Sequence, residues 1–166
     1  MADLALAMGM HSPSIYAAFG SKEELFREAA ARYEQRFASR LNRLLEEAPT
    51  AVSAIRAFFA EAIETYVECA RGCFLVMATA NGPSDSVVVR ERLAGKRERG
   101  LQAIRARLKR GCREGDLDPA CDVDALAAYV ITVAQGLSMQ AREGASREML
   151  AAVTRTALAG IERYGR

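Results

Sequence analysis

Two side chains near the start of the sequence are suited to binding phosphate oxygens. Tyr16 carries a hydroxyl, and Lys22 carries a positive charge beside the start of a predicted helix. Hydroxyl and ammonium groups at such places are common contacts to a nucleic-acid backbone. The helix before Lys22 has small side chains on its surface, and these allow a helix to enter a major groove. They are Ser14, Ala17 and Ala18.

Catalytic chemistry has little support in the sequence. The chain contains one histidine, His11, and it has no nucleophile elbow, phosphate-binding glycine loop or HExxH motif. Glu61, Glu64 and Glu68 lie three and four residues apart, but without a Glu-x-x-His partner we expect a solvated helix face rather than a di-metal site. We therefore predict a protein that is not an enzyme and needs no cofactor.

The cysteines form no CxxC pair, which favours free thiols in a reducing compartment, with a redox or metal-binding role as the alternative. They are Cys69, Cys73, Cys112 and Cys121.

Local signals divide the first part of the chain into short helices. Gly9 ends a first helix, and Ser12-Pro13 begins a second, since a hydroxyl cap followed by proline favours a helix start. Gly20 ends the second helix, and Ser21-Lys22-Glu23-Glu24 forms a capping box before a long amphipathic helix. This order is typical of a helix-turn-helix, although short helices joined by a glycine turn also occur in ordinary helical proteins.

The composition indicates one all-α domain, or one domain with a small appendage. Of the 166 residues, 51% are hydrophobic and 27% are charged, so a packed core is expected. The net charge of +2 is too small to argue for nucleic-acid binding by itself. No segment resembles a signal peptide or a membrane span, and we expect a cytoplasmic protein with no membrane partner.

The stretch LALAMGMHSPSIYAAFGSKEELFREAA resembles the DNA-binding signature of the TetR family of transcriptional repressors. The matching positions are Gly9, Ile15, Tyr16, Phe19, Lys22 and Leu25. The resemblance implies a helix-turn-helix DNA-binding domain over residues 1–24 and a helical effector-binding and dimerisation domain over residues 25–166. It also implies that DNA is contacted by His11, Ser12, Pro13, Ser14, Tyr16, Ala17, Ala18 and Lys22. His11 stands where the family usually has a serine, which leaves the helix cap open between residues 11 and 12.

The resemblance also leaves a second function open. Family members begin with a further helix that packs under the helix-turn-helix, and this chain starts at the helix that follows it. The first hypothesis is a homodimeric repressor that a small hydrophobic effector releases from a palindromic operator. The alternative is a dimeric small-molecule-binding module that does not bind DNA.

Two predicted helices near the C-terminus, residues 123–143 and 146–164, carry more apolar and small residues than one domain is expected to cover. Pairing of two copies into a four-helix bundle would cover them, although an intramolecular core is the alternative. Such pairing would also place two recognition helices about 34 Å apart, as a palindrome requires. The expected interface residues are Val130, Ala134, Leu137, Ser138, Val153, Thr156, Ala157 and Gly160.

Aromatic and methionine side chains on the central helices are candidates for an effector pocket, because apolar walls suit a hydrophobic ligand. Helical spacing also allows them to be plain core. They are Phe58, Phe59, Tyr66, Phe74, Met77 and Tyr129.

Residues 90–113 hold ten basic and two acidic side chains. This helix has its own apolar stripe, so we expect a solvated basic face, with attraction to DNA or to an acidic helix as the alternative.

Overall fold

The computed structural model describes residues 1–68, 72–81 and 87–166, and the all-α prediction is confirmed. No β-strand occurs within these ranges, and none of their helices is long and apolar enough to cross a membrane. The helices are α1 (Ala2–Met8), α2 (Ser12–Phe19), α3 (Lys22–Tyr33), the π-helical segment η1 (Glu34–Ala38), α4 (Ser39–Glu47), α5 (Ala51–Glu68), α6 (Phe74–Asn81), α7 (Val87–Glu114), α8 (Val123–Arg142) and α9 (Arg147–Glu162).

Polar side chains cap three of these helices, and one of the caps is the predicted capping box. Ser21 and Glu24 form the capping box: the Glu24 amide donates to the Ser21 hydroxyl over 3.1 Å, and the Ser21 amide donates to Glu24 Oε2 over 3.0 Å. Asp122 accepts from the first amides of α8, and Ser146 accepts from an amide of α9. Each cap satisfies donors that the helix itself cannot pair.

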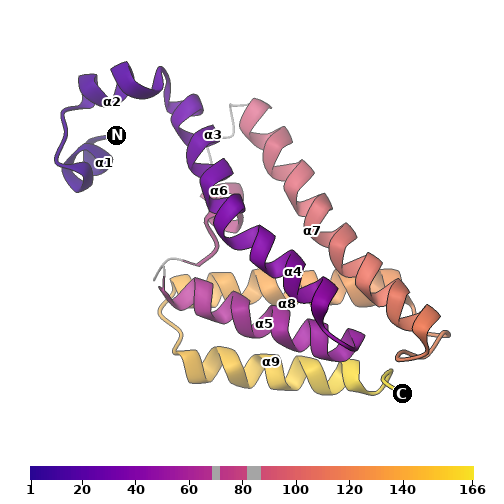
Figure 1. The fold of residues 1–166 in the computed structure, drawn as a ribbon. Helices are drawn as coiled ribbons and strands as arrows, with labels where there is room; N and C mark the ends of the chain where they lie inside the picture. The colour runs from indigo at the N-terminus through magenta and orange to yellow at the C-terminus, as the bar shows by residue number, and fades with distance from the viewer. Residues whose placement is uncertain (69–71, 82–86) are drawn as a thin grey trace.

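The long helix predicted after Ser21 differs from the prediction in its middle. Residues Glu34–Ala38 form a π-helical turn, which separates α3 from α4 without ending the rod (Figure 1). A π-turn accommodates one extra residue, so it shifts which side chains face the body of the protein on either side. The spacing of apolar residues predicts the helix but contains no signal for this local change.

Helix α5 lies at the centre of the larger, C-terminal part of the fold. It contacts α4, α7, α8 and α9, and the last three of these also enclose much of the apolar core. Ile55 and Phe59 of α5, Leu137 of α8, and Leu150 and Ile161 of α9 are almost completely buried. This core fixes the position of α4, and therefore of the rod that leads to the N-terminal helices.

Helices α1 and α2 lie at the far end of that rod, away from α5, α8 and α9 (Figure 1). They contact each other, and α2 packs on α3. This arrangement presents α2 at one extremity of the molecule, where a large partner can reach it.

Candidate DNA-binding surface and regulatory core

A single apolar anchor holds α2 against its neighbours. Ile15 is 1% exposed and Phe19, one turn later, is half-buried, so the opposite face of α2 is turned outward. Gly9 ends α1 with a left-handed φ of 61°, which places α2 at an angle to α1. His11 occupies the N-cap position without a side-chain hydrogen bond, and Pro13 lies in the first turn. The structure therefore places the cap at residue 11.

The outward face of α2 contains most of the residues expected to contact DNA. Ser12 is half-buried, and the remaining seven are exposed: His11, Pro13, Ser14, Tyr16, Ala17, Ala18 and Lys22. Lys22 is the first residue of α3, where amides at the start of the helix face outward. Small side chains on α2, flanked by a hydroxyl and an ammonium group, form a surface that can enter a groove and bind phosphates on its walls.

The candidate effector residues differ in burial. Phe58, Phe59 and Tyr66 of α5 are buried, and Phe74 and Met77 of α6 are half-buried. Tyr129 of α8 is 43% exposed, and its place among the pocket-lining residues stays a prediction. Val130 and Ala134 of the same helix are buried in the core.

An aromatic cluster that the sequence analysis did not identify links α6 to α3. The ring of Phe74 lies 5.4 Å from Phe26 and 5.7 Å from Tyr33, and Tyr33 lies 4.8 Å from Phe37. The seven- and four-residue spacings of Phe26, Tyr33 and Phe37 were the available signal for their common face. These rings pack α6 against α3, the helix that follows α2.

Polar contacts beside this cluster connect α3 to α8 through Cys73, the residue before α6. The Tyr33 hydroxyl donates to Cys73 Sγ over 3.4 Å, and the Cys73 amide donates to Ser138 Oγ on α8 over 2.7 Å. Burial raises the pKa of the Tyr66 hydroxyl far above its ordinary value, and the Cys73 thiol acts in the same direction. Tyr66 therefore remains protonated and keeps its hydrogen for a ligand or neighbour.

Two of the residues expected on solvated faces are instead held in ion pairs with the rod. Glu61 of α5 is buried and pairs with Arg40 of α4 over 3.1 Å, whereas Glu64 and Glu68 are exposed as predicted. Lys96 of α7 is largely buried and pairs with Glu34 of η1. Desolvation, followed by the nearby charge of Arg99, lowers the pKa of Lys96. The basic helix is therefore not solvated along its whole length, and the burial of Arg107 makes the same point.

The expected dimer interface needs correction. Val130, Ala134, Leu137, Ser138 and Ala157 are buried inside the chain's own core, so the intramolecular alternative is right for these five residues. Val153, Thr156 and Gly160 are exposed on α9. The sequence shows that α8 and α9 are apolar around most of their surface, but it does not show which face of each helix is buried.

The cysteines within the described residues are free thiols, as the sequence favoured, while Cys69 lies outside those residues. Cys112 and Cys121 lie close together, with their sulfur atoms 3.5 Å apart. No cluster of three or more metal-ligating side chains occurs among the residues that the structure describes.

The chain matches two family profiles. Residues 1–29 match "Bacterial regulatory proteins, tetR family", and residues 51–158 match "Tetracyclin repressor-like, C-terminal domain". Together these matches cover α1, α2, the start of the rod and most of the helical body.

Relatives of known name agree with this assignment. The chain is 32% identical over 161 residues to the HTH-type transcriptional repressor ComR of Escherichia coli K12, covering 95% of this chain and 77% of that protein. It is 38% identical to the TetR family regulator CifR, solved as a cysteine mutant with 26-base-pair operator DNA, with a TM-score of 0.87 over 96% of this chain and 84% of that one. A TetR regulator from Chloroflexus aurantiacus J-10-FL is 25% identical, with a TM-score of 0.80 over 99% of this chain and 84% of that one.

The fold and the outward-facing α2 define a helix-turn-helix transcription factor with an attached helical regulatory domain. The chain belongs to the TetR family of bacterial transcriptional regulators, which bind DNA and are not enzymes. The resemblance stated from the sequence is thereby confirmed, and the function as a DNA-binding regulator is favoured over the module that does not bind DNA.

Proposed function

We propose that two copies of this protein bind a palindromic operator through their α2 helices and repress transcription, and that a small hydrophobic effector releases them. Residues 1–24 would form the DNA-binding domain, and residues 25–166 would bind the effector and the second copy. The observation that carries the proposal is the orientation of α2: Ile15 is anchored inward, so the expected DNA contacts face outward. The similarity to a regulator solved with operator DNA supports the same interpretation.

The outward stripes of α8 and α9 support pairing of two copies. On α8, Tyr129, Gly136 and Met139 are exposed at helical spacing, and on α9 Met149 and Val153 are followed by Thr156 and Gly160. A Cβ added at Gly136 or Gly160 would meet no atom of the chain within 4 Å, so both backbones are open to a close neighbour. Apolar and small residues on adjacent antiparallel helices suit a four-helix bundle between subunits. The revised interface keeps Val153, Thr156 and Gly160 and adds Tyr129, Gly136, Met139 and Met149.

The aromatic contacts of α6 support the proposed route from effector to DNA. A hydrophobic molecule seated beside Phe58, Phe59 and Tyr66 would displace Phe74 and Met77, which are only half-buried. Because Phe74 touches Phe26 and Tyr33, a shift of α6 would move α3 and change the spacing of the two α2 helices. An effector acts only if it binds one spacing more tightly than the other.

Binding of the full-length protein to DNA from its own promoter, at a stated salt concentration, tests the proposal directly. Fluorescence anisotropy should give a specific affinity well above that for a scrambled duplex, with two protomers per site, and sedimentation should give a dimer. Saturable binding of the neutral fluorescent probe N-phenyl-1-naphthylamine to wild type, but not to Phe74→Ala, would support the effector region. A monomer in solution, or equal affinity for both duplexes, would contradict the proposal.

A further inference from the structure

A groove of about 310 Å³ lies between α4 and α7, separate from the aromatic cluster around α6. Arg107, Arg110 and Arg113 of α7 line one side, and Asn42 and Glu46 of α4 line the other. Its volume lies at the lower end of the usual range for ligand sites, so the groove suits a compact molecule. Three arginines around so small a space indicate a site for negative charge.

Arg107 is the unusual member of this set, because it is only 3% exposed and incompletely paired. Its Nη2 donates to the Ala48 carbonyl over 3.4 Å and to Asp116 Oδ2 over 3.5 Å, and both contacts are long. Its Nε and Nη1 have no hydrogen-bond partner within the described residues. A guanidinium has five donors, and burying them unpaired is costly.

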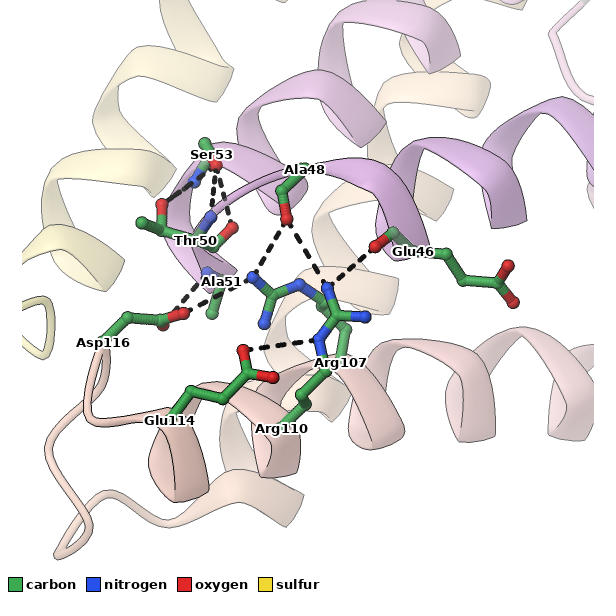
Figure 2. Close-up of polar contacts among 9 residues, drawn as sticks. All are labelled: Glu46, Ala48, Thr50, Ala51, Ser53, Arg107, Arg110, Glu114 and Asp116. Atoms are coloured by element: carbon green, nitrogen blue, oxygen red, sulfur yellow. Dashed lines mark hydrogen bonds and ion pairs between the residues drawn. The ribbon is translucent and has the colours of Figure 1, made fainter.

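Two of the nearby acidic groups pair with arginines of the groove, and the third is turned away. Asp116 also accepts the Ala51 amide on Oδ1 over 3.0 Å, and Glu114 pairs with Arg110 over 3.6 Å. Figure 2 shows the Glu46 carboxylate pointing away from Arg107 and Arg110, which contact backbone carbonyls at the end of α4. Arg113 is exposed at the edge of the groove. The unpaired donors of Arg107 and the exposed guanidinium of Arg113 are therefore the groups of this cluster that remain for a ligand.

We propose that this groove binds a small oxyanion, a molecule with phosphate or carboxylate groups. Planar guanidinium groups bind both kinds of oxyanion through paired hydrogen bonds. Arg110 and Arg113 lie three residues apart on one face of α7, so both reach the same ligand while Arg107 contributes charge from beneath. This ligand is distinct in chemistry and in place from the hydrophobic effector.

Bound oxyanion would also join α4 to α7. Helix α4 continues the rod that carries α2, so a ligand bridging these helices restricts the rod's movement and changes the affinity for DNA. This regulatory step rests on the proposed function, whereas binding of the oxyanion does not.

Isothermal titration of the full-length protein with inorganic phosphate and with citrate, at constant ionic strength, tests the site. At least one probe should give saturable one-site binding, and the tighter probe distinguishes a phosphate ligand from a carboxylate one. Arg113→Gln should weaken binding about tenfold, as loss of one charge-assisted contact implies. Because Arg113 is exposed, this variant should keep its fold, which circular dichroism would verify. Arg110→Gln should weaken binding similarly.

Arg90→Gln provides the matched control, since Arg90 is an exposed arginine of the same helix outside the groove. It should bind the probes like wild type. Absence of saturable binding by both probes, or equal loss in Arg90→Gln and Arg113→Gln, would overturn the site. Operator binding is measured in phosphate- and citrate-free buffer, so its failure would count against the proposed function alone.

Discussion

Lys96 of α7 forms an ion pair with Glu34, which lies in the π-helical turn between α3 and α4. The lysine side chain is 7% exposed and that of Glu34 is 25% exposed, so water screens the pair only partly. The contact joins the body of the protein to the rod at the place where the rod departs from α-helical geometry. Regular hydrogen bonding is altered there, and an ion pair stabilises the altered turn against the body.

Removing one partner of this pair should cost more than removing both. We expect Lys96→Met and Glu34→Gln each to lower the free energy of unfolding by about 2–4 kcal/mol, because each leaves a poorly solvated group unpaired. The double variant should lose less than the sum of the two single losses. Urea unfolding of the four proteins measures this difference, and strictly additive losses would show that the pair does not contribute.

The lowered pKa of Lys96 adds a pH dependence to the same experiment. Burial and the Arg99 charge disfavour the protonated amine in the folded state. Between that lowered pKa and the ordinary lysine pKa, the unfolded chain holds more protons, so wild-type stability should rise with pH relative to Lys96→Met. A relative fall over that alkaline window would contradict the assignment.

The sequence predicted local structure better than it predicted packing. Ser21 begins a helix as expected, because capping depends on residues a few positions away. The outward face of α2 was also predictable, since Ile15 and Phe19 define the inner face. Val130 and Tyr129 show the limit of local prediction. They are neighbours on an apolar helix, and only the packing of α8 against the other helices decides that Val130 is buried and Tyr129 exposed. The sequence likewise predicts Arg107 on a solvated face, whereas in the structure it is buried next to Ala48 and Asp116.

The capping box at Ser21 links helix stability to the DNA-binding surface. Ser21→Ala removes the acceptor for the Glu24 amide. We expect this change to lower the free energy of unfolding by about 1 kcal/mol. The same change frees the start of α3, next to Lys22, so operator affinity should fall as well. Ser39→Ala, an exposed position at the junction of η1 and α4, is the control and should leave both quantities nearly unchanged. Thermal unfolding and anisotropy provide the readouts, and equal behaviour of the two variants would refute the prediction.

Gly72 is required where the chain enters α6. Its φ is +71°, and an added Cβ would lie 2.3 Å from the Ser138 carbonyl oxygen. Gly72→Ala should therefore destabilise the fold by about 2 kcal/mol or more, from backbone strain and collision with α8. Gly100→Ala is the contrast: residue 100 lies inside α7, and the nearest atom to an added Cβ would be Ile131 Cδ1 at 3.9 Å, so the free energy of unfolding should stay equal or rise by about 0.5–1 kcal/mol. The midpoints of denaturant unfolding of the two variants and the wild type measure these effects. An unchanged midpoint in Gly72→Ala would show that the contact between α6 and α8 rearranges to accept the methyl group.

Cys121 should react slowly with alkylating agents. Desolvation, then the hydrogen bond with Cys112, raises the pKa of the Cys121 thiol to about 11, so little thiolate exists at neutral pH. Its carbamidomethylation rate, followed by mass spectrometry, should reach half its maximum near pH 11. In Cys112→Ser, which lacks the second thiol, the midpoint should move toward the ordinary value. A wild-type midpoint near 9 would show that burial does not protect this thiol.

The outward side chains of α2 and the start of α3 should divide into those that position the protein on DNA and those that read sequence. Lys22→Ala and Tyr16→Phe should weaken binding to all duplexes alike, because both groups are expected at phosphates. Only Lys22→Ala should also reduce the slope of log affinity against log salt, by roughly one for each lost phosphate contact, since a neutral hydroxyl displaces no counterion. Ser14→Ala should instead change the preference among operator variants. Lys109→Ala, an exposed lysine of α7, serves as the control for general charge and should leave affinity and slope nearly intact. Anisotropy titrations at several salt concentrations distinguish these cases, and an unchanged slope in Lys22→Ala would mean that its ammonium group does not lie at a phosphate.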